Sequence, residues 1–287
     1  MTAKLIILTL KPVDCEPALA LALENGITTL EEKRVGPKLQ LHLQIPKQAS
    51  AKALVARLRA GEKKLPRPIF QSITIKILKD ESWKKAYQRY LAPFVFPAPA
   101  GQALPLTIDP VGPYLKRAPL NTLIIQGQLA FGTGHHPSTQ LAGYLVQKVL
   151  MEKSPSALLD VGCGTGILAM VAYRRGLKDI TAVENDPEAR AVARENFLGN
   201  KIIGIRLVDR LAAVRRRFPL IVANILAKTL IELKPSLEAR LQAGGSIILS
   251  GLNYRDIPEI LRAYRGFRLV ERKNKKGWSA LWLEKKG

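Results

Sequence analysis

Hydrophobic and polar residues follow two different patterns along the chain. Over residues 1–79, the stretches LIILTL (5–10), LQLHLQI (39–45) and SITIKIL (72–78) are apolar or alternate with period two, which predicts strands. PALALALENG (17–26) and SAKALVARLRAG (50–61) read as helices that end at glycine, and the second carries apolar residues at helical spacing. With a further strand over ITTLEEKR, the order strand, helix, strand, strand, helix, strand predicts a small ferredoxin-like α+β domain.

The second pattern begins near residue 129 and continues to residue 287. Short apolar segments (ALLDV, DITAVE, GIRLV, PLIVAN and SIILS) alternate there with helical stretches. This pattern predicts an α/β domain, a doubly wound Rossmann-like sheet with helices on both faces. Residues 80–128 lie between the two patterns. They predict a connecting helix and then a proline-rich linker or an irregular β segment, because seven prolines fall between 93 and 119.

Composition narrows the class of protein. No run approaches the ~18 apolar residues of a membrane-spanning helix. The two cysteines, Cys15 and Cys163, lack the spacing of a zinc site or a disulfide framework, which favours the reducing cytoplasm. The formal charge is +22, with +8 on residues 1–79 and +14 on the remainder. A positive charge spread in this way predicts at most a weak contact with rRNA rather than a dedicated nucleic-acid arm.

The stretch DVGCGTG (160–166) stands between a predicted strand and a predicted helix. Gly162, Gly164 and Gly166 allow a tight turn and a close approach of a ligand to the backbone. Glu184 follows Gly162 by 22 residues, at the end of the next strand, where a carboxylate can accept hydrogen bonds from ribose hydroxyls. The G-x-G-x-G spacing and the lack of a phosphate-binding lysine favour S-adenosylmethionine over a dinucleotide or a nucleoside triphosphate.

Two other places carry candidate chemistry. In FGTGHHPST (131–139), the adjacent histidines point opposite ways on an extended chain, so no metal site is predicted. His136 is expected to hydrogen-bond within the loop, with a role as proton acceptor left open. The stretch is predicted to form a lid and edge of the cofactor pocket. Asn224 ends the fourth predicted strand, where a crevice opens, and its carbonyl either accepts a hydrogen bond from a target amine or caps the turn.

Together, FGTGHHPST, DVGCGTG, AVEND (182–186) and VANIL (222–226) resemble the ribosomal protein L11 methyltransferase family (PrmA type), which are class I S-adenosylmethionine-dependent methyltransferases. The resemblance implies that the small domain docks the ribosomal protein and that lysine side chains or the α-amine are methylated. It places cofactor contacts on Thr139, Gly162, Glu184 and Asn224, although the family commonly has Asp in place of Glu184. Completing the predicted set are Gly164, Gly166, Phe131, Gly132 and Thr133.

Methyl transfer from a sulfonium requires the amine to be neutral and in line with the methyl group, and it requires no strong base. Asn224 and His136 are therefore the candidate catalytic residues. NIL stands where many methyltransferases of amides and nucleobase amines have NPPY, which favours an aliphatic amine as substrate. The alternatives are an rRNA or other RNA methyltransferase, an enzyme acting on the lysine of another protein, and a non-catalytic protein that binds ribosomes.

Overall fold

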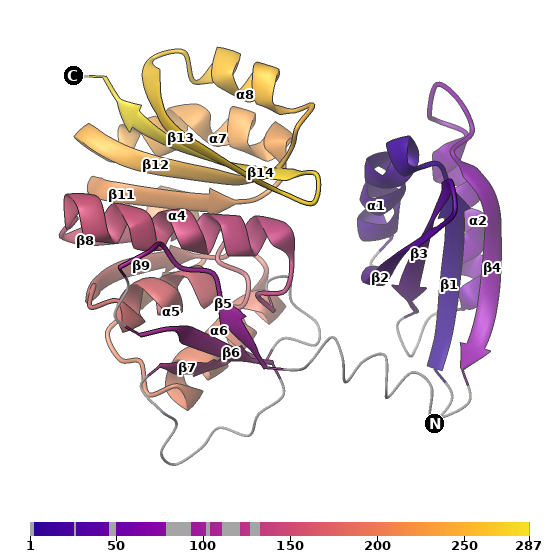
Figure 1. Cartoon of the computed structure of the whole chain (residues 1–287), viewed down its shortest axis with the longest axis horizontal. Helices are drawn as coiled ribbons and strands as arrows, with labels where there is room; N and C mark the ends of the chain where they lie inside the picture. Colours follow the sequence, from indigo (N-terminus) through magenta and orange to yellow (C-terminus); the bar gives the residue numbers. More distant parts are fainter. Residues whose placement is uncertain are drawn as a thin grey trace. The chain divides into compact units, whose positions relative to one another are not determined.

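The computed structural model describes residues 3–25, 27–45, 50–78, 93–101, 104–110, 121–126 and 133–286. The chain divides into two compact units, Met1–Tyr90 and Leu91–Gly287 (Figure 1). Each unit has hydrophobic core residues of its own. The helix predicted after residue 80 lies outside the described residues up to residue 92, and the domain boundaries at 79 and 128 stay predictions.

The first unit is a four-stranded antiparallel sheet in the order β2-β3-β1-β4. Apolar side chains from one face of the sheet pack against two helices, and Ile6, Leu8 and Leu58 are among the fully buried residues. The ferredoxin-like arrangement predicted from the sequence is therefore confirmed. Its elements are β1 (Ala3–Leu10), α1 (Cys15–Glu24), β2 (Thr28–Val35), β3 (Lys38–Gln44), α2 (Ala51–Glu62) and β4 (Phe70–Leu78).

A buried carboxylate joins helix α2 to the start of strand β4. Oε1 of Glu62 accepts hydrogen bonds from the backbone N–H groups of Ile69 (2.8 Å) and Phe70 (2.6 Å), and Arg59 donates to Oε2 at 2.7 Å. Burial works against ionisation, but these donors outweigh it and hold the pKa of Glu62 below its usual range. The ionised side chain therefore contributes to stability.

The second unit is built on a seven-stranded sheet in the order β10-β9-β8-β11-β12-β14-β13 (Figure 1). The first five strands in this order run parallel, whereas β14 is antiparallel to both β12 and β13. The strands are β8 (Ala157–Val161), β9 (Asp179–Val183), β10 (Arg206–Val208), β11 (Phe218–Asn224), β12 (Leu241–Asn253), β13 (Phe267–Lys275) and β14 (Trp278–Lys285). The doubly wound sheet predicted from the sequence is confirmed.

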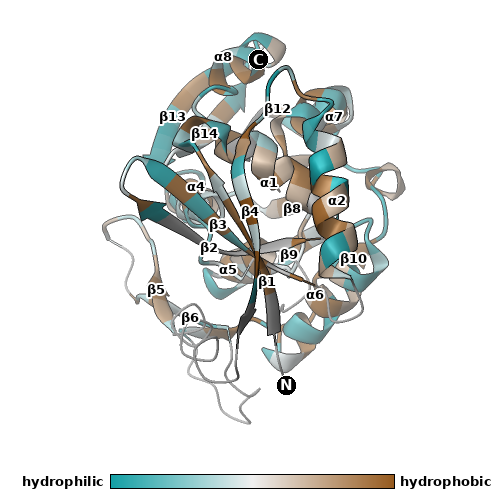
Figure 2. Ribbon diagram, turned by 90° about the vertical axis from the view of Figure 1, so that its right-hand side faces the viewer, coloured by the Kyte–Doolittle hydropathy of each residue, from teal (hydrophilic) through white to brown (hydrophobic). Residues whose placement is uncertain are grey.

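Helices cover both faces of this sheet because its central strands, β8 and β11, are apolar and buried on both sides (the hydropathy of the chain is drawn in Figure 2). Leu158 and Val222 face a core shared with α4 and α5, whereas Leu159 and Ile221 face a core shared with α7 and α8. The helices are α4 (Pro137–Lys153), α5 (Ile167–Arg174), α6 (Pro187–Gly199), α7 (Ala227–Ala239) and α8 (Ile257–Ala263).

Part of the stretch that the sequence assigns to a proline-rich linker forms a small three-stranded sheet of β5 (Phe94–Phe96), β6 (Leu106–Asp109) and β7 (Thr122–Ile124). Among the described prolines of this stretch, Pro97, Pro105 and Pro110 lie beside these strands and not within them, so they remove no hydrogen bond from the sheet. Phe96 is fully buried against Gly143 of α4, where a Cβ atom would lie 2.2 Å from its ring. Where the structure describes this stretch, at residues 94–101, 104–110 and 121–124, it contains strands, as the predicted irregular β segment would.

Glu62 generates a prediction about acid sensitivity. Because its pKa is lower in the folded chain, its contribution is full above the unfolded pKa of about 4.5 and is lost as the pH falls through the folded value. We expect Glu62→Gln to reduce the free energy of unfolding by roughly 1–3 kcal/mol at pH 7, with a smaller deficit at pH 3.5. Urea unfolding at both pH values measures it, with the exposed Glu24→Gln as control. A deficit that does not change with pH would contradict the assignment.

Candidate functional site

The candidate site lies where the order of the parallel strands reverses. Strands β9 and β10 follow β8 on one side of the sheet, and β11 and β12 follow on the other. In open α/β sheets, ligands bind at the carboxyl ends of the strands at this point. The glycine loop (162–166) leaves β8 here, and Asn224 is the last residue of β11.

The backbone of the glycine loop has the shape that the sequence predicts. Gly162, Gly164 and Gly166 have φ angles of +70°, +54° and +81°, which lie in the left-handed region that side-chain-bearing residues rarely adopt. A Cβ atom at Gly166 would lie 2.4 Å from the ring of Phe197. The loop is therefore a cradle of backbone that cannot carry side chains at these positions.

Glu184 is almost fully buried beside this cradle. Its Oε2 accepts the N–H of Gly164 at 2.9 Å, and its Oε1 accepts the N–H of Asp186 at 3.1 Å. Asp186 in turn caps helix α6, as its position before Pro187 predicts. An ionised carboxylate offers about four acceptor positions, so Glu184 retains capacity for two ribose hydroxyls. The side chain thus shapes the loop as well as offering a ligand contact.

Asn224 and Thr139 are brought together although they are 85 residues apart. The Asn224 Nδ2 donates to Thr139 Oγ1 at 3.2 Å. Within the part of the chain that the structure describes, the buried Oδ1 of Asn224 has no hydrogen-bond partner. A buried acceptor left in this way costs about 1–3 kcal/mol, so the side chain is held ready for a donor that arrives with a ligand. Thr139 orients Asn224 and is itself buried.

The position of Asn224 is fixed by its neighbour Ile225, which is wedged between two glycines. A Cβ atom at Gly162 would lie 2.5 Å from Cγ2 of Ile225. A Cβ atom at Gly251, in β12, would lie 2.5 Å from the carbonyl oxygen of Ile225. Gly251 also has a φ of +81°, so both its conformation and its surroundings require glycine.

Sequence reasoning missed Asp160, which is fully buried at the end of β8. Its Oδ2 accepts the N–H of Ala169 at 3.0 Å, and among the described residues its Oδ1 has no partner. Burial, reinforced by the nearby Glu184 and opposed by the Ala169 hydrogen bond, raises the pKa of Asp160 to about 7. The signal available in the sequence is an acid directly before the glycine loop. Burial also keeps the Cys163 thiol protonated by raising its pKa.

His136 serves as the N-cap of helix α4. Its Nδ1 accepts the N–H of Ser138 at 3.3 Å and lies 2.7 Å from Ser138 Oγ, and its ring packs edge-on against Trp278. Burial lowers the pKa of His136 to about 4. The neutral ring with Nδ1 already engaged suits a capping role. Of the other predicted lid residues, Thr133 is half-buried, and Phe131 and Gly132 lie outside the described residues.

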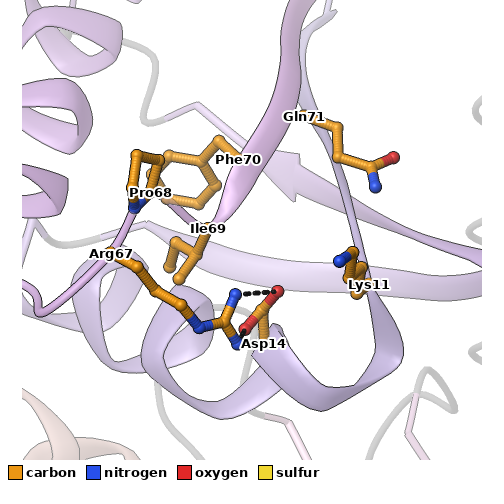
Figure 3. Close-up of a pocket in the computed structure, with 7 residues that line it drawn as sticks. All are labelled: Lys11, Asp14, Arg67, Pro68, Ile69, Phe70 and Gln71. Carbon is orange, nitrogen blue, oxygen red and sulfur yellow. Dashed lines mark hydrogen bonds and ion pairs between the residues drawn. The ribbon is translucent and has the colours of Figure 1, made fainter.

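A separate cavity of about 250 Å³ lies in the first unit, between the start of α1 and the start of β4 (Figure 3). Three charged residues line it: Arg67 and the buried Asp14 form an ion pair, with Arg67 Nη2 2.5 Å from Asp14 Oδ1, and Lys11 is the third. Figure 3 shows this pair next to Ile69 and Phe70. The buried carboxylate of Asp14 is therefore already engaged by Arg67.

Among the described residues, no three His, Cys, Asp or Glu side chains are grouped so that they could hold a metal ion. No described helix is both long and apolar enough to cross a bilayer.

The sheet order, the antiparallel β14 and the glycine loop at the switch point define the class I methyltransferase fold. The family model described as "Ribosomal protein L11 methyltransferase (PrmA)" matches residues 13–286, so this chain belongs to that family.

Individual relatives agree with this assignment. Ribosomal protein L11 methyltransferase from Lactobacillus helveticus is 34% identical over 75% of this chain and 68% of its own length. The protein of the same name from Lactobacillus acidophilus is 33% identical over 67% and 60%. The crystal structure of ribosomal protein L11 methylase from Lactobacillus delbrueckii subsp. bulgaricus matches with a TM-score of 0.53 and 34% identity, covering 58% of this chain and 85% of that chain. The match thus spans about three fifths to two thirds of these two curated relatives.

The residues at the switch point fit S-adenosylmethionine, the cofactor of this class of enzyme. Gly162 and Gly166 have no room for side chains, Glu184 can take a ribose, and the buried Asp160 Oδ1 and Asn224 Oδ1 offer unused acceptors. A cationic ligand without phosphates matches acceptors of this kind.

Asp160 generates a prediction about pH. Folding raises the pKa of Asp160 from 3.8 to about 7. The carboxyl group is therefore protonated in both states below pH 4 and costs no stability there, whereas above pH 7 its ionisation lowers the free energy of unfolding by the largest amount. We expect the stability of Asp160→Asn relative to the wild type to rise by roughly 1–4 kcal/mol between pH 4.5 and pH 8 in the cofactor-free protein. Urea unfolding measures it, with the exposed Asp209→Asn as control. If the free energies of unfolding of wild type and Asp160→Asn changed equally with pH, the raised pKa of Asp160 would be refuted.

Proposed function

We propose that this protein transfers methyl groups from S-adenosylmethionine to amino groups of ribosomal protein L11, at lysine side chains or at the α-amine. One observation carries the proposal: the buried, unpartnered Oδ1 of Asn224 beside a glycine cradle closed by Glu184. The family to which the chain belongs and the names of its relatives support the choice of substrate.

The cofactor side of the site has two tasks. When bound, S-adenosylmethionine supplies a methyl group activated by a sulfonium. Glu184 binds the ribose hydroxyls with its remaining lone pairs, while its hydrogen bond to the Gly164 N–H keeps the loop open for the ligand. The carboxylate of Asp160 offers a negative charge in a buried place, where it interacts strongly with a cation.

The amine side of the site orients a nucleophile. The Oδ1 of Asn224 accepts an N–H from the target amine, and Thr139 fixes the direction of that bond. A free lysine has a pKa of about 10.4, and removal from water favours its neutral form. A hydrogen bond to an amide carbonyl tolerates the neutral amine and turns its lone pair toward the methyl group. His136 contributes by capping α4 and not by accepting a proton.

The first unit, proposed as the domain over residues 1–79, is assigned to docking L11, either free or on the ribosome in the cytoplasm. With its net charge of +8 it does not contain the larger part of the positive charge. We assign the excess charge to weak contact with rRNA near the substrate. An RNA methyltransferase is not favoured, because the family and the named relatives are protein methyltransferases.

The experiment that tests the function is mass analysis of intact L11 and of ribosomes after incubation with the protein and S-adenosylmethionine. We expect L11 to gain whole methyl groups and rRNA to gain none. If methyl groups were found in rRNA and not in L11, the RNA methyltransferase would replace this proposal. Cofactor binding without methyl transfer to any ribosomal component would point to a binding protein.

Glu184 generates a prediction about the cofactor. We expect Glu184→Gln to weaken S-adenosylmethionine binding by about tenfold or more, because the amide loses one acceptor and the negative charge. Glu184→Asp keeps the carboxylate that relatives of this family commonly carry and should stay within about threefold of wild type. Titration calorimetry on folded variants measures both. Equal affinity for wild type and Glu184→Gln would remove the ribose assignment.

Asn224 generates a prediction about turnover. We expect Asn224→Ala to lower kcat for L11 methylation by roughly a hundredfold and to change the cofactor Kd by less than about threefold. Thr139→Val keeps Asn224 but removes its tether, so a smaller loss of kcat is expected. Single-turnover methylation followed by mass analysis gives the rates. If Asn224→Ala turns over normally, Asn224 does not contact the amine.

A further inference from the structure

Two buried asparagines, Asn196 in helix α6 and Asn200 at the C-cap of that helix, pair with an extended segment as a neighbouring β-strand would. Asn196 and Asn200 lie one helical turn apart, and both are almost fully buried. The amide of Asn200 accepts the N–H of Ile124 (2.8 Å) and donates to its carbonyl (2.7 Å). The amide of Asn196 does the same for Gln126, at 2.8 Å and 2.9 Å. Alternate residues of an extended chain are thus paired as a neighbouring strand would pair them.

This arrangement clamps segment 122–126 between two partners. On its other side, β7 pairs in parallel with β6, and the Ile125 N–H donates to the carbonyl of Asp109 at 2.9 Å. Successive backbone groups of the segment therefore bond to β6 and to α6 in alternation. A buried strand edge would otherwise leave its polar groups unpaired, which is costly.

The two asparagines differ in their third hydrogen bond. Asn196 Nδ2 also donates to the backbone carbonyl of Thr165 at 3.0 Å, inside the glycine loop. The Nδ2 of Asn200 instead donates to the carbonyl of Asn196 at 2.8 Å and lies 3.8 Å from Sδ of Met170 in α5, and neither of these partners belongs to the glycine loop. Only Asn196 therefore joins segment 122–126 to the loop that is proposed to hold the cofactor.

Helix α6 reaches the same loop at two further points. Two residues before the helix-capping Asp186, Glu184 holds the Gly164 N–H. Next to Asn196, the Phe197 ring fills the space in which Gly166 would carry a Cβ atom. Gly164, Thr165 and Gly166 are thus each set by a residue in or just before α6.

We propose that Asn196 is a positioning residue for cofactor binding, which fixes the glycine loop against segment 122–126. It touches no reacting atom in this account and acts through the Thr165 carbonyl. The identity of the ligand rests on the proposed function, whereas the contact itself does not. Asn200 provides the matched control, because it has the same role toward the segment without the bond to the loop.

The test compares Asn196→Asp with Asn200→Asp. Each change keeps the acceptor for the backbone N–H and removes the donors, so both should lower the melting temperature by similar amounts. We expect the Kd for S-adenosylmethionine, measured by calorimetry on the full chain, to rise by about tenfold or more for Asn196→Asp and by less than about twofold for Asn200→Asp. Equal changes in Kd would overturn the proposal, and so would an unchanged Kd in a folded Asn196→Asp.

A second measurement does not depend on the cofactor. Amide hydrogen exchange of the peptide spanning 162–168, without ligand, should be faster in Asn196→Asp than in Asn200→Asp. If the wild type fails to bind S-adenosylmethionine, the proposed function fails, while this comparison still decides the contact with the loop. Equal exchange in the two variants would then refute the positioning role. If Asn196→Asp does not fold, Asn196→Ser and Asn200→Ser replace the pair, with the same expected difference.

Discussion

The close approach of three strand ends at the switch point is the constraint on which the site depends. The chain at Ile225 lies so near to Gly162 and Gly251 that neither position has room for a Cβ atom. Because β8, β11 and β12 end together, the glycine loop and Asn224 face the same crevice. The packing of Ile225, through its side chain on Gly162 and its backbone on Gly251, thus sets the geometry of the site.

Within this frame, the acceptors that lack a partner are concentrated where a ligand is expected. Oδ1 of Asp160 and Oδ1 of Asn224 are both buried, and neither has a hydrogen-bond partner in the described part of the chain. Neighbouring groups such as Glu184 and His136 already bond to backbone amides. Most buried polar groups of a folded protein have hydrogen-bond partners. Leaving these two oxygens unpaired at the carboxyl ends of the central strands costs free energy, and a ligand that donates hydrogen bonds to them offsets this cost.

The sequence predicted the architecture of both units because period-two alternation and apolar parallel strands are local signals. The glycine loop and the buried acid at 184 were found for the same reason. Strands β5 to β7 were predicted only as an irregular β segment, as an alternative to a linker, because the prolines around them dominate the local pattern. Asn196 and Asn200 resemble polar residues on the exposed face of a helix. Their role depends on the chain 70 and 76 residues away, which no local pattern reveals.

Helices α4 and α6 position opposite sides of the site. Helix α6 sets the loop on the cofactor side, whereas the start of α4 is attached to the two strand ends on the amine side. Asn224 of β11 and Ser250 of β12 are paired in the sheet, and each bonds to one of two successive residues of α4, Thr139 and Ser138. A shift of the start of α4 would therefore turn Asn224. The stretch 133–139 is thus attached directly to the residue proposed to orient the amine, which gives that stretch a mechanical role beyond covering the cofactor.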